Sequence, residues 1–140
     1  MNDHTSDQCP IETEILDLCN FDVPLPDADI VVAADILYEP RTGEAVARRL
    51  AEALLRGSRV MLGDSPGRPG RPSFLKELQR LFPGIDAVFE DTVGTTCSGP
   101  RNELICGENS MSVSTVPGTL PIAVLDLHPD SITSLNYVGN

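Results

Sequence analysis

Two side chains able to bind a cation stand close together in this sequence, directly after an apolar run. The run is Ile30–Ala34, and Asp35 and Tyr38 follow it. A carboxylate can orient an amine through hydrogen bonds, and a tyrosine ring can add a cation–π contact. Ligands of open α/β sheets bind beyond the carboxyl ends of the strands, so the pair predicts a functional site there. Two plainer interpretations remain open: Asp35 as a cap of the helix or turn after the strand, and Tyr38 as an aromatic lid on the core.

The elements that must position this pair follow from the hydrophobic pattern. An uninterrupted apolar run such as Ile30–Ala34 is typical of a strand buried on both faces of a parallel sheet. Residues 40–56 predict an amphipathic helix, which Gly57 would end. The apolar stripe of this helix contains Val46, Leu50 and Leu54, and its other faces carry Arg48, Arg49, Glu52 and Arg56.

The rest of the chain alternates between strand and helix patterns. A second helix is expected from Ser73 to about residue 82, after a Pro- and Gly-rich loop of residues 64–72. Such alternation predicts parallel strands joined by helical crossovers, followed by an antiparallel finish. The predicted fold class is α/β: a partial doubly wound, mostly parallel sheet with flanking helices. Further strands are expected at residues 58–63, 85–93, 103–106 and 122–127, and residues 11–18 could form a short strand.

The composition is that of a globular domain with an acidic N-terminal part. The 140 residues are 41% hydrophobic, and no window approaches the roughly 20 apolar residues of a membrane span. The net charge is −11, and the first 40 residues hold ten acidic side chains and neither Lys nor Arg. Because phosphates repel such a chain, we expect no nucleic-acid partner, and we expect no membrane partner either. We expect residues 1–10 to be a disordered leader, residues 11–128 one domain, and residues 129–140 a loose tail.

The cysteines give no sign of a metal site. Cys9, Cys19, Cys97 and Cys106 form no CxxC pair and have no histidine at ligand spacing, so we expect no metal. The N-terminus is polar and acidic where a signal peptide needs basic residues and an apolar core. Without a targeting signal, we expect an intracellular protein with free thiols, either cytoplasmic or organellar.

Three short motifs resemble the class I (seven-β-strand) protein-lysine methyltransferases, which use S-adenosylmethionine. Residues 35–38 (Asp-Ile-Leu-Tyr) match the Asp/Glu-x-x-Tyr/Phe signature after the fourth strand of these enzymes. Residues 16–18 (Leu-Asp-Leu) resemble the Leu-Asp-Trp element that precedes this strand. Residues 63–69 (Gly-Asp-Ser-Pro-Gly-Arg-Pro) are similar to a Gly-Asp-Pro-Gly-Arg-Pro segment of the electron-transfer flavoprotein β-subunit lysine methyltransferases, and this match is the most specific. The resemblance covers roughly residues 11–128.

The resemblance implies a Rossmann-like methyltransferase fold, of which this chain would be the C-terminal half. It also implies a protein substrate bearing a lysine, and related enzymes are mitochondrial. The catalytic residues would be Asp35 and Tyr38, near the sulfonium carbon of S-adenosylmethionine and the incoming amine. The implied cofactor contacts are Asp17, Leu18 and Ala34, the first two beside the adenine, and the implied substrate channel is flanked by Asp64 and Arg68.

The sequence departs from this family in two respects. Leu18 replaces an aromatic ring and offers the adenine no stacking, and no GxGxG-type turn is present to hold the methionine part of the cofactor. We therefore expect a truncated methyltransferase that is inactive by itself. Its strand at Ile30–Ala34 would lack the first strand as a neighbour and leave an unpaired edge. The alternative is a non-catalytic α/β interaction module that pairs this open edge with a partner strand.

Overall fold

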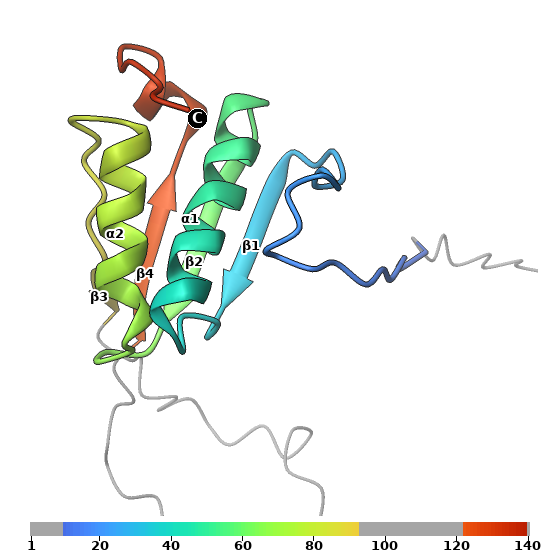
Figure 1. The fold of residues 1–140 in the computed structure, drawn as a ribbon, viewed down its shortest axis with the longest axis horizontal. Coiled ribbons are helices and arrows are strands. Elements are labelled where there is room, and N and C mark those ends of the chain that lie inside the picture. Colours follow the sequence, from blue (N-terminus) through green and yellow to red (C-terminus); the bar gives the residue numbers. More distant parts are fainter. Residues whose placement is uncertain (1–9, 93–121, 140) are drawn as a thin grey trace, which may run out of the picture.

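The computed structural model describes residues 10–92 and 122–139, which form a four-stranded sheet with two helices packed on it (Figure 1). The α/β class predicted from the sequence is confirmed. The strands lie in the order β1-β2-β4-β3. They are β1 (Ile30–Ala34), β2 (Arg59–Asp64), β3 (Glu90–Thr92) and β4 (Ile122–Leu127). The helices are α1 (Pro40–Leu55) and α2 (Gly70–Leu81), and a short 3-10 helix, η1 (Pro129–Ile132), follows β4.

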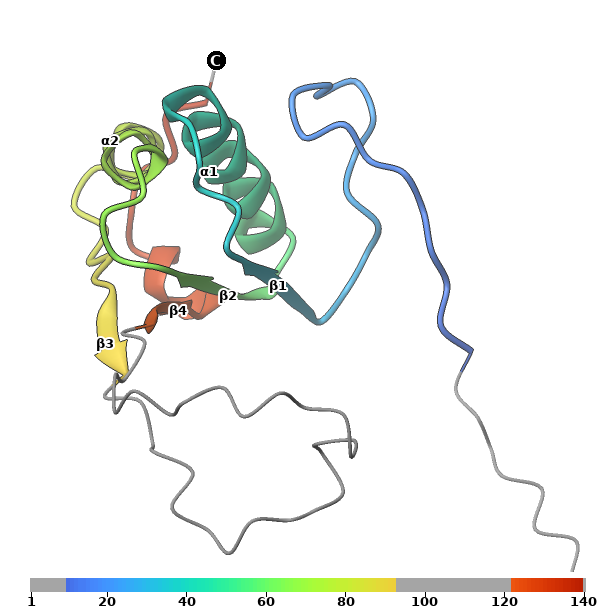
Figure 2. The ribbon, with the colours of Figure 1, turned by 90° about the horizontal axis from the view of Figure 1, so that it is seen from below.

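The sheet is mixed, whereas the sequence predicts a mostly parallel one. β1 and β2 are parallel and joined by α1, but β4 is antiparallel to both β2 and β3. The antiparallel pairing of the last strand is therefore as predicted, but the prediction overestimates the proportion of parallel strand pairs. Both helices lie on the same face of the sheet, as Figure 2 shows. Among the residues described, no helix covers the other face, so the arrangement differs from a doubly wound sheet.

This one-sided cover explains why β1 is not buried on both faces, as its apolar run predicts. Val31 and Ala33 pack against the core under α1. Ile30 and Val32 point to the uncovered face, where their exposed fractions are 51% and 68%. A continuous apolar run therefore misjudges β1, because no helix among the described residues covers the second face of the sheet.

Helix α1 forms and ends as its sequence predicts. Its apolar stripe is buried in the core between the sheet and α2. At its end, Gly57 adopts a φ of 93°, in the left-handed region that glycine enters without strain. The N–H groups of Gly57 and Ser58 donate to the carbonyls of Leu54 and Ala53, both at 3.0 Å, which satisfies two carbonyls of the last turn.

The two helices cross at a pair of glycines, which fixes the loop before α2. A Cβ on Gly43 would lie 2.1 Å from the Gly70 carbonyl oxygen, so only glycine permits this approach. The Gly70 N–H donates to the Leu37 carbonyl at 3.0 Å, which ties the start of α2 to the segment after β1. α2 begins at Gly70 rather than at the predicted Ser73, since Pro72 is tolerated in a first turn.

Three predicted features differ from the structure. Residues 11–18 form no strand, and Ile11 and Ile15 are almost fully exposed, because no neighbouring strand pairs with them. A strand is predicted at residues 85–93, and within its described part, residues 85–92, only Glu90–Thr92 form a strand, because β4 pairs with these three. The segment expected to be a loose tail packs on the domain instead: Ile132 is buried, and the Val138 N–H donates to the Leu81 carbonyl at 2.8 Å. The strand predicted at residues 103–106 and nearly all of the predicted leader, residues 1–9, lie outside the described residues.

Candidate functional site

Asp35 and Tyr38 lie beyond the carboxyl end of β1, where the sequence predicts a site. The Asp35 N–H still bonds to the sheet, because it donates to the Gly63 carbonyl of β2 at 2.8 Å. Its φ of 51° then turns the chain out of the strand, in the left-handed region that aspartate tolerates better than most residues. Tyr38 follows on the segment that leads into α1 and is 53% exposed. This exposure excludes a tyrosine lid buried on the core.

The Asp35 carboxylate is the centre of a four-residue cluster from two loops. Its Oδ2 accepts a hydrogen bond from the Tyr38 hydroxyl at 2.9 Å. Its Oδ1 accepts from Arg68 Nη2 at 2.6 Å and Nε at 3.1 Å, and from the Ser65 hydroxyl at 3.3 Å. The Arg68 guanidinium also lies 4.2 Å from the centre of the Tyr38 ring. A cation is thus held between a carboxylate and an aromatic face.

These contacts set the protonation state of the cluster. Hydrogen bonds from Arg68 and then from Tyr38 lower the pKa of the Asp35 carboxyl below its ordinary value. The same Asp35 carboxylate raises the pKa of the Tyr38 hydroxyl and of the Arg68 guanidinium. At neutral pH the cluster therefore contains an anionic Asp35, a protonated Tyr38 and a cationic Arg68. Tyr38 is a hydrogen-bond donor in this state and not a base.

The loop that carries Arg68 is anchored by a neighbouring ion pair. Asp64, at the end of β2, is almost fully buried, and its Oδ2 accepts from Arg71 Nε at 3.0 Å. Arg71 Nη2 donates to the Asp64 carbonyl at 3.0 Å, and its guanidinium lies 4.4 Å from the Phe89 ring centre. The resemblance assigns Asp64 and Arg68 to a substrate channel. In the structure Arg68 lies at the exposed cluster, whereas Asp64 is held in a buried ion pair that fixes the loop.

The residues assigned to the cofactor lie in two places. Ala34 ends β1, next to Asp35 in the chain and exposed. Asp17 and Leu18 lie in the segment that crosses α1, and the Asp17 carboxylate accepts from the Cys19 N–H at 2.9 Å. Leu18 is partly buried against the core. Neither Asp17 nor Leu18 makes a hydrogen bond to the Asp35 cluster in the part of the chain that the structure describes.

The sequence misses one buried residue, Arg49, which the helical pattern places on an exposed face of α1. Its side chain is only 2% exposed, because residues 17–25 fold over it. Its guanidinium donates to the carbonyls of Asp17 (3.3 Å), Leu18 (3.2 Å), Asn20 and Val23 (2.8 Å), and to the carboxylate of Glu52 (3.0 Å). Nothing in the periodicity distinguishes Arg49 from Arg48, so only the tertiary structure could reveal this role.

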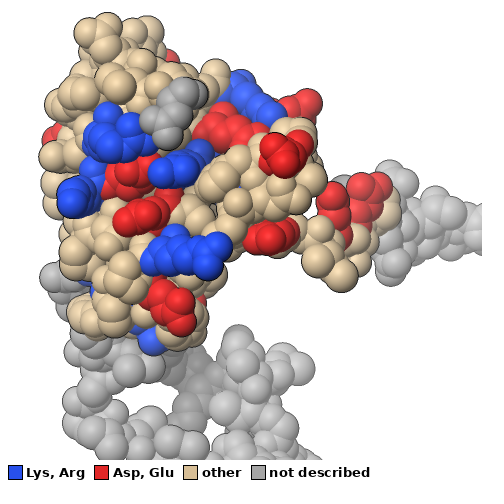
Figure 3. Space-filling view, viewed as in Figure 1, with Lys and Arg blue, Asp and Glu red and all other residues tan. Residues whose placement is uncertain are grey.

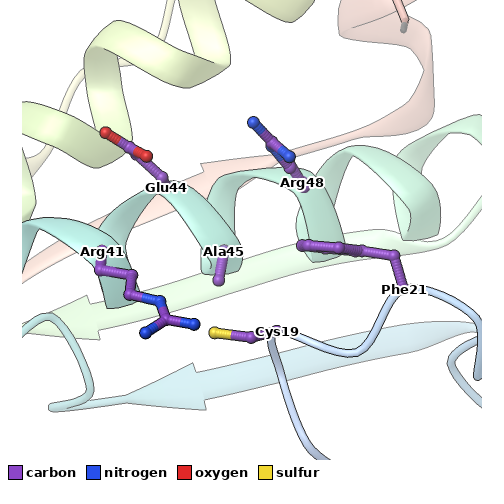
Figure 4. A pocket seen from close by; sticks show the side chains of 6 residues that line it. All are labelled: Cys19, Phe21, Arg41, Glu44, Ala45 and Arg48. Atoms are coloured by element: carbon purple, nitrogen blue, oxygen red, sulfur yellow. The ribbon is translucent and has the colours of Figure 1, made fainter.

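A surface pocket of about 180 Å³ lies beside α1, away from the predicted site. Figure 4 shows its lining, in which the Arg41 guanidinium points toward the Cys19 sulfur and Phe21 closes the other end. None of the predicted site residues lines it, and its surface carries both charges. It therefore lacks the mostly apolar lining of a typical small-molecule site. The lining residues are Cys19, Phe21, Arg41, Glu44, Ala45 and Arg48.

The described residues contain no group of three His, Cys, Asp or Glu side chains placed to hold a metal ion. None of their helices is long and apolar enough to cross a membrane. Comparisons with known proteins identify no relative: no family model matches the chain, and neither does any curated protein or solved structure.

Proposed function

We propose that this chain carries the lysine-binding side of a protein-lysine N-methyltransferase of the S-adenosylmethionine-dependent class I family. One observation supports this most strongly: a carboxylate and an aromatic ring at the end of a parallel strand already hold a cation. That cation is the Arg68 guanidinium, bonded to Asp35 at 2.6 Å and lying 4.2 Å from the Tyr38 ring centre. A lysine ammonium carries the same charge and suits the same two partners. The resemblance of residues 35–38 and 63–69 to these enzymes supports the choice of reaction.

In this proposal Asp35 binds and orients the amine, and the Tyr38 ring forms the aromatic face that the amine contacts. Methyl transfer to an amine requires the nitrogen to be held at near-attack geometry. Asp35 is anionic at neutral pH, since Arg68 and Tyr38 lower its pKa, and it attracts an ammonium group. This group must pass its proton to water before the neutral nitrogen can attack the methyl carbon. Tyr38 stays protonated and directs its hydroxyl to Asp35, so its ring can make a cation–π contact with the lysine once Arg68 has left it. Arg68 must move aside, because it occupies the position of the substrate cation.

The residues assigned to the cofactor lie in two parts of the described structure, Ala34 at the end of β1 and Asp17 with Leu18 over α1. The Asp17 carboxylate accepts from the Cys19 N–H, and the Leu18 carbonyl accepts from Arg49, so both take part in contacts within the chain. The sequence contains no Gly-rich turn of the GxGxG type. We therefore expect little or no binding of S-adenosylmethionine by this chain alone. Calorimetric titration measures this directly.

The lysine-binding role is tested with the chain itself and a pair of peptides. A peptide with one lysine should shift the amide NMR signals of Asp35 and Tyr38, and the same peptide with an acetylated lysine should not. Asp35→Asn should weaken this binding, because the amide cannot neutralise an ammonium group. If Asp35→Asn and Tyr38→Phe both leave the lysine peptide bound as before, the proposal is wrong.

A second candidate function is a non-catalytic interaction module, and the position of β1 favours it. β1 forms an edge of the described sheet and exposes apolar side chains. An open edge of this kind can take up a strand of another protein. Micromolar binding of S-adenosylmethionine in the same calorimetric titration would exclude this candidate.

A further inference from the structure

The backbone of β1 offers hydrogen-bonding groups on the side away from β2. The Asp29 carbonyl accepts from β2 at 2.9 Å and the Asp35 N–H donates to β2 at 2.8 Å, at the two ends of the strand. Because bonds to a parallel neighbour come from every second residue, Val31 and Ala33 also face β2. The N–H and C=O groups that point away from β2, to the open edge, belong to Ile30, Val32 and Ala34.

The same three residues expose their side chains. Ile30, Val32 and Ala34 all point to the face of the sheet that α1 and α2 leave uncovered, and Val32 is 68% exposed. Backbone groups and apolar side chains are therefore available together along five residues. An open apolar edge of this kind is a template for a further strand.

Carboxylates surround both ends of this edge. Asp27 and Asp29 precede β1, and the Asp27 side chain is 97% exposed and lies 3.5 Å from Arg56 Nη1. Asp35 follows the strand, and its carboxylate is paired with Arg68 at 2.6 Å. No Lys or Arg occurs before Arg41 in the sequence. Figure 3 shows acidic but no basic side chains among the charged residues of the described arm that precedes β1, whereas both charges occur over the helices. Arg56 and Arg68 offset part of this charge, and the remaining acidic side chains, Asp29 among them, favour a basic partner at the edge.

The same charges argue against a second copy of this chain as the occupant. Antiparallel pairing of two β1 strands about Val32 would place Asp29 of each copy opposite Asp35 of the other. Like charges directly opposite one another destabilise a strand pair. The exposed segment of residues 11–18 is no better suited, because it carries Glu12, Glu14 and Asp17.

We infer that the β1 edge binds an extended segment of another polypeptide that carries Lys or Arg just beyond each end of an apolar, β-branched stretch. The backbone groups at Ile30, Val32 and Ala34 supply the hydrogen bonds, and the flanking aspartates select the basic ends. This inference builds on the second candidate function and does not depend on methyl transfer at Asp35.

The test uses the full chain and two short peptides of equal length. Both contain the same alternating Val and Thr stretch, flanked by two lysines at each end in one peptide and by two glutamates in the other. We expect the lysine peptide to bind about tenfold more tightly at low salt, and the difference to shrink as salt is added. Hydrogen exchange should become slower at the amides of Ile30, Val32 and Ala34. The amides of Val31 and Ala33, which already bond to β2, should change little.

Matched variants keep the result interpretable. Val32→Lys places a charge in the middle of the edge and should abolish binding of the lysine peptide. Val88→Lys is the control, because Val88 is similarly exposed, at 61%, and lies outside every strand. Val32→Pro removes the edge N–H and should also abolish binding, since proline is tolerated where the N–H faces away from the sheet.

Three results would overturn the inference. Equal binding of the two peptides would show that the aspartates do not favour a partner with basic ends. Slower exchange elsewhere in the chain, without a change at Ile30, Val32 and Ala34, would place the binding site off the edge. A concentration-dependent dimer that Val32→Lys dissolves would show that a second copy occupies β1. A failure of the lysine-binding test at Asp35 would leave all three readouts unchanged, so the two proposals fail separately.

Discussion

Replacing Arg49 with methionine should release residues 17–25 from α1 and destabilise the domain. The Arg49 side chain is buried, and its guanidinium binds four backbone carbonyls of this segment together with the Glu52 carboxylate. A methionine keeps the apolar stem but provides no donor for these acceptors. The carbonyls must then find water, which requires the segment to lift away from the helix.

The expected cost follows from the number of partners and from what the loop can do. A hydrogen bond to a charged group contributes about 1.5–3 kcal/mol, so five such bonds set a generous upper limit. The loop can open and expose its carbonyls to water, which recovers most of the free energy of the lost hydrogen bonds. Breaking a buried ionic contact in proteins costs about 3–5 kcal/mol. We expect Arg49→Met to lower the free energy of unfolding by about 3 kcal/mol.

Arg48→Met is the matched control, because Arg48 is the neighbouring residue of the same helix. Its side chain is 39% exposed and pairs with Glu77 at 2.8 Å, so its loss should cost about 0–1 kcal/mol. Urea unfolding compares the two variants, and hydrogen exchange reports on the loop. The Leu25 N–H donates to Glu52 at 2.9 Å and should exchange faster in Arg49→Met. Equal stability of the two variants, with an unchanged Leu25 amide, would refute the reasoning.

Three further outcomes are expected. Gly70→Ala should cost about 1–3 kcal/mol in urea unfolding, because its Cβ would lie 2.5 Å from the Glu39 carbonyl oxygen. Gly63→Ala is the control, because a Cβ on Gly63 would meet no atom within 4 Å. An equal loss of stability in this variant would contradict the explanation. The pKa of Glu77 is lowered to about 2, chiefly by a hydrogen bond from Arg80, so its stabilisation is complete above about pH 4.5 and is lost as the pH falls toward 2. Glu77→Gln should flatten the dependence of stability on pH in that window, and an unchanged slope would contradict this. Asp35→Asn should bring the pKa of Tyr38 down toward its ordinary value, since the carboxylate is the main cause of its rise. Absorbance titration in a Tyr137→Phe background measures it, and a pKa that stays raised would disprove the hydrogen bond.

The local pattern of the sequence predicts the elements better than it predicts their surroundings. α1, β2 and β4 lie within a residue or two of their predicted bounds, because periodicity and a terminal glycine specify them locally. The predicted burial of β1 on both faces is wrong, since burial depends on which strands and helices lie beside the strand. Arg49 and the Gly43–Gly70 crossing depend on residues about 30 positions away in the chain, so no local pattern encodes them.

The candidate site also combines residues that the local pattern predicts with contacts that only the tertiary structure reveals. Asp35 and Tyr38 are predictable, because a carboxylate and a phenol directly after an apolar run must lie at the end of a strand. Arg68 is found through its motif, and Ser65 lies in the same motif but is not predicted as a site residue. Their meeting at one carboxylate requires β1 and β2 to be parallel neighbours, with the loop before α2 held by Gly70. That arrangement belongs to the tertiary structure.

β1 connects the two proposals physically, because its last residue precedes Asp35. A strand paired with Ile30–Ala34 advances by about 3.3 Å per residue along the edge. A lysine placed one or two residues beyond Ala34 would come near Asp35, but it would have to displace Arg68 from the carboxylate and the ring. A basic end on the docked strand and a substrate lysine would compete for the same cation site. The two proposals thus meet at Asp35 but depend on different groups: strand docking on the backbone of Ile30, Val32 and Ala34 and the acidic arm before β1, and lysine binding on Asp35 and Tyr38.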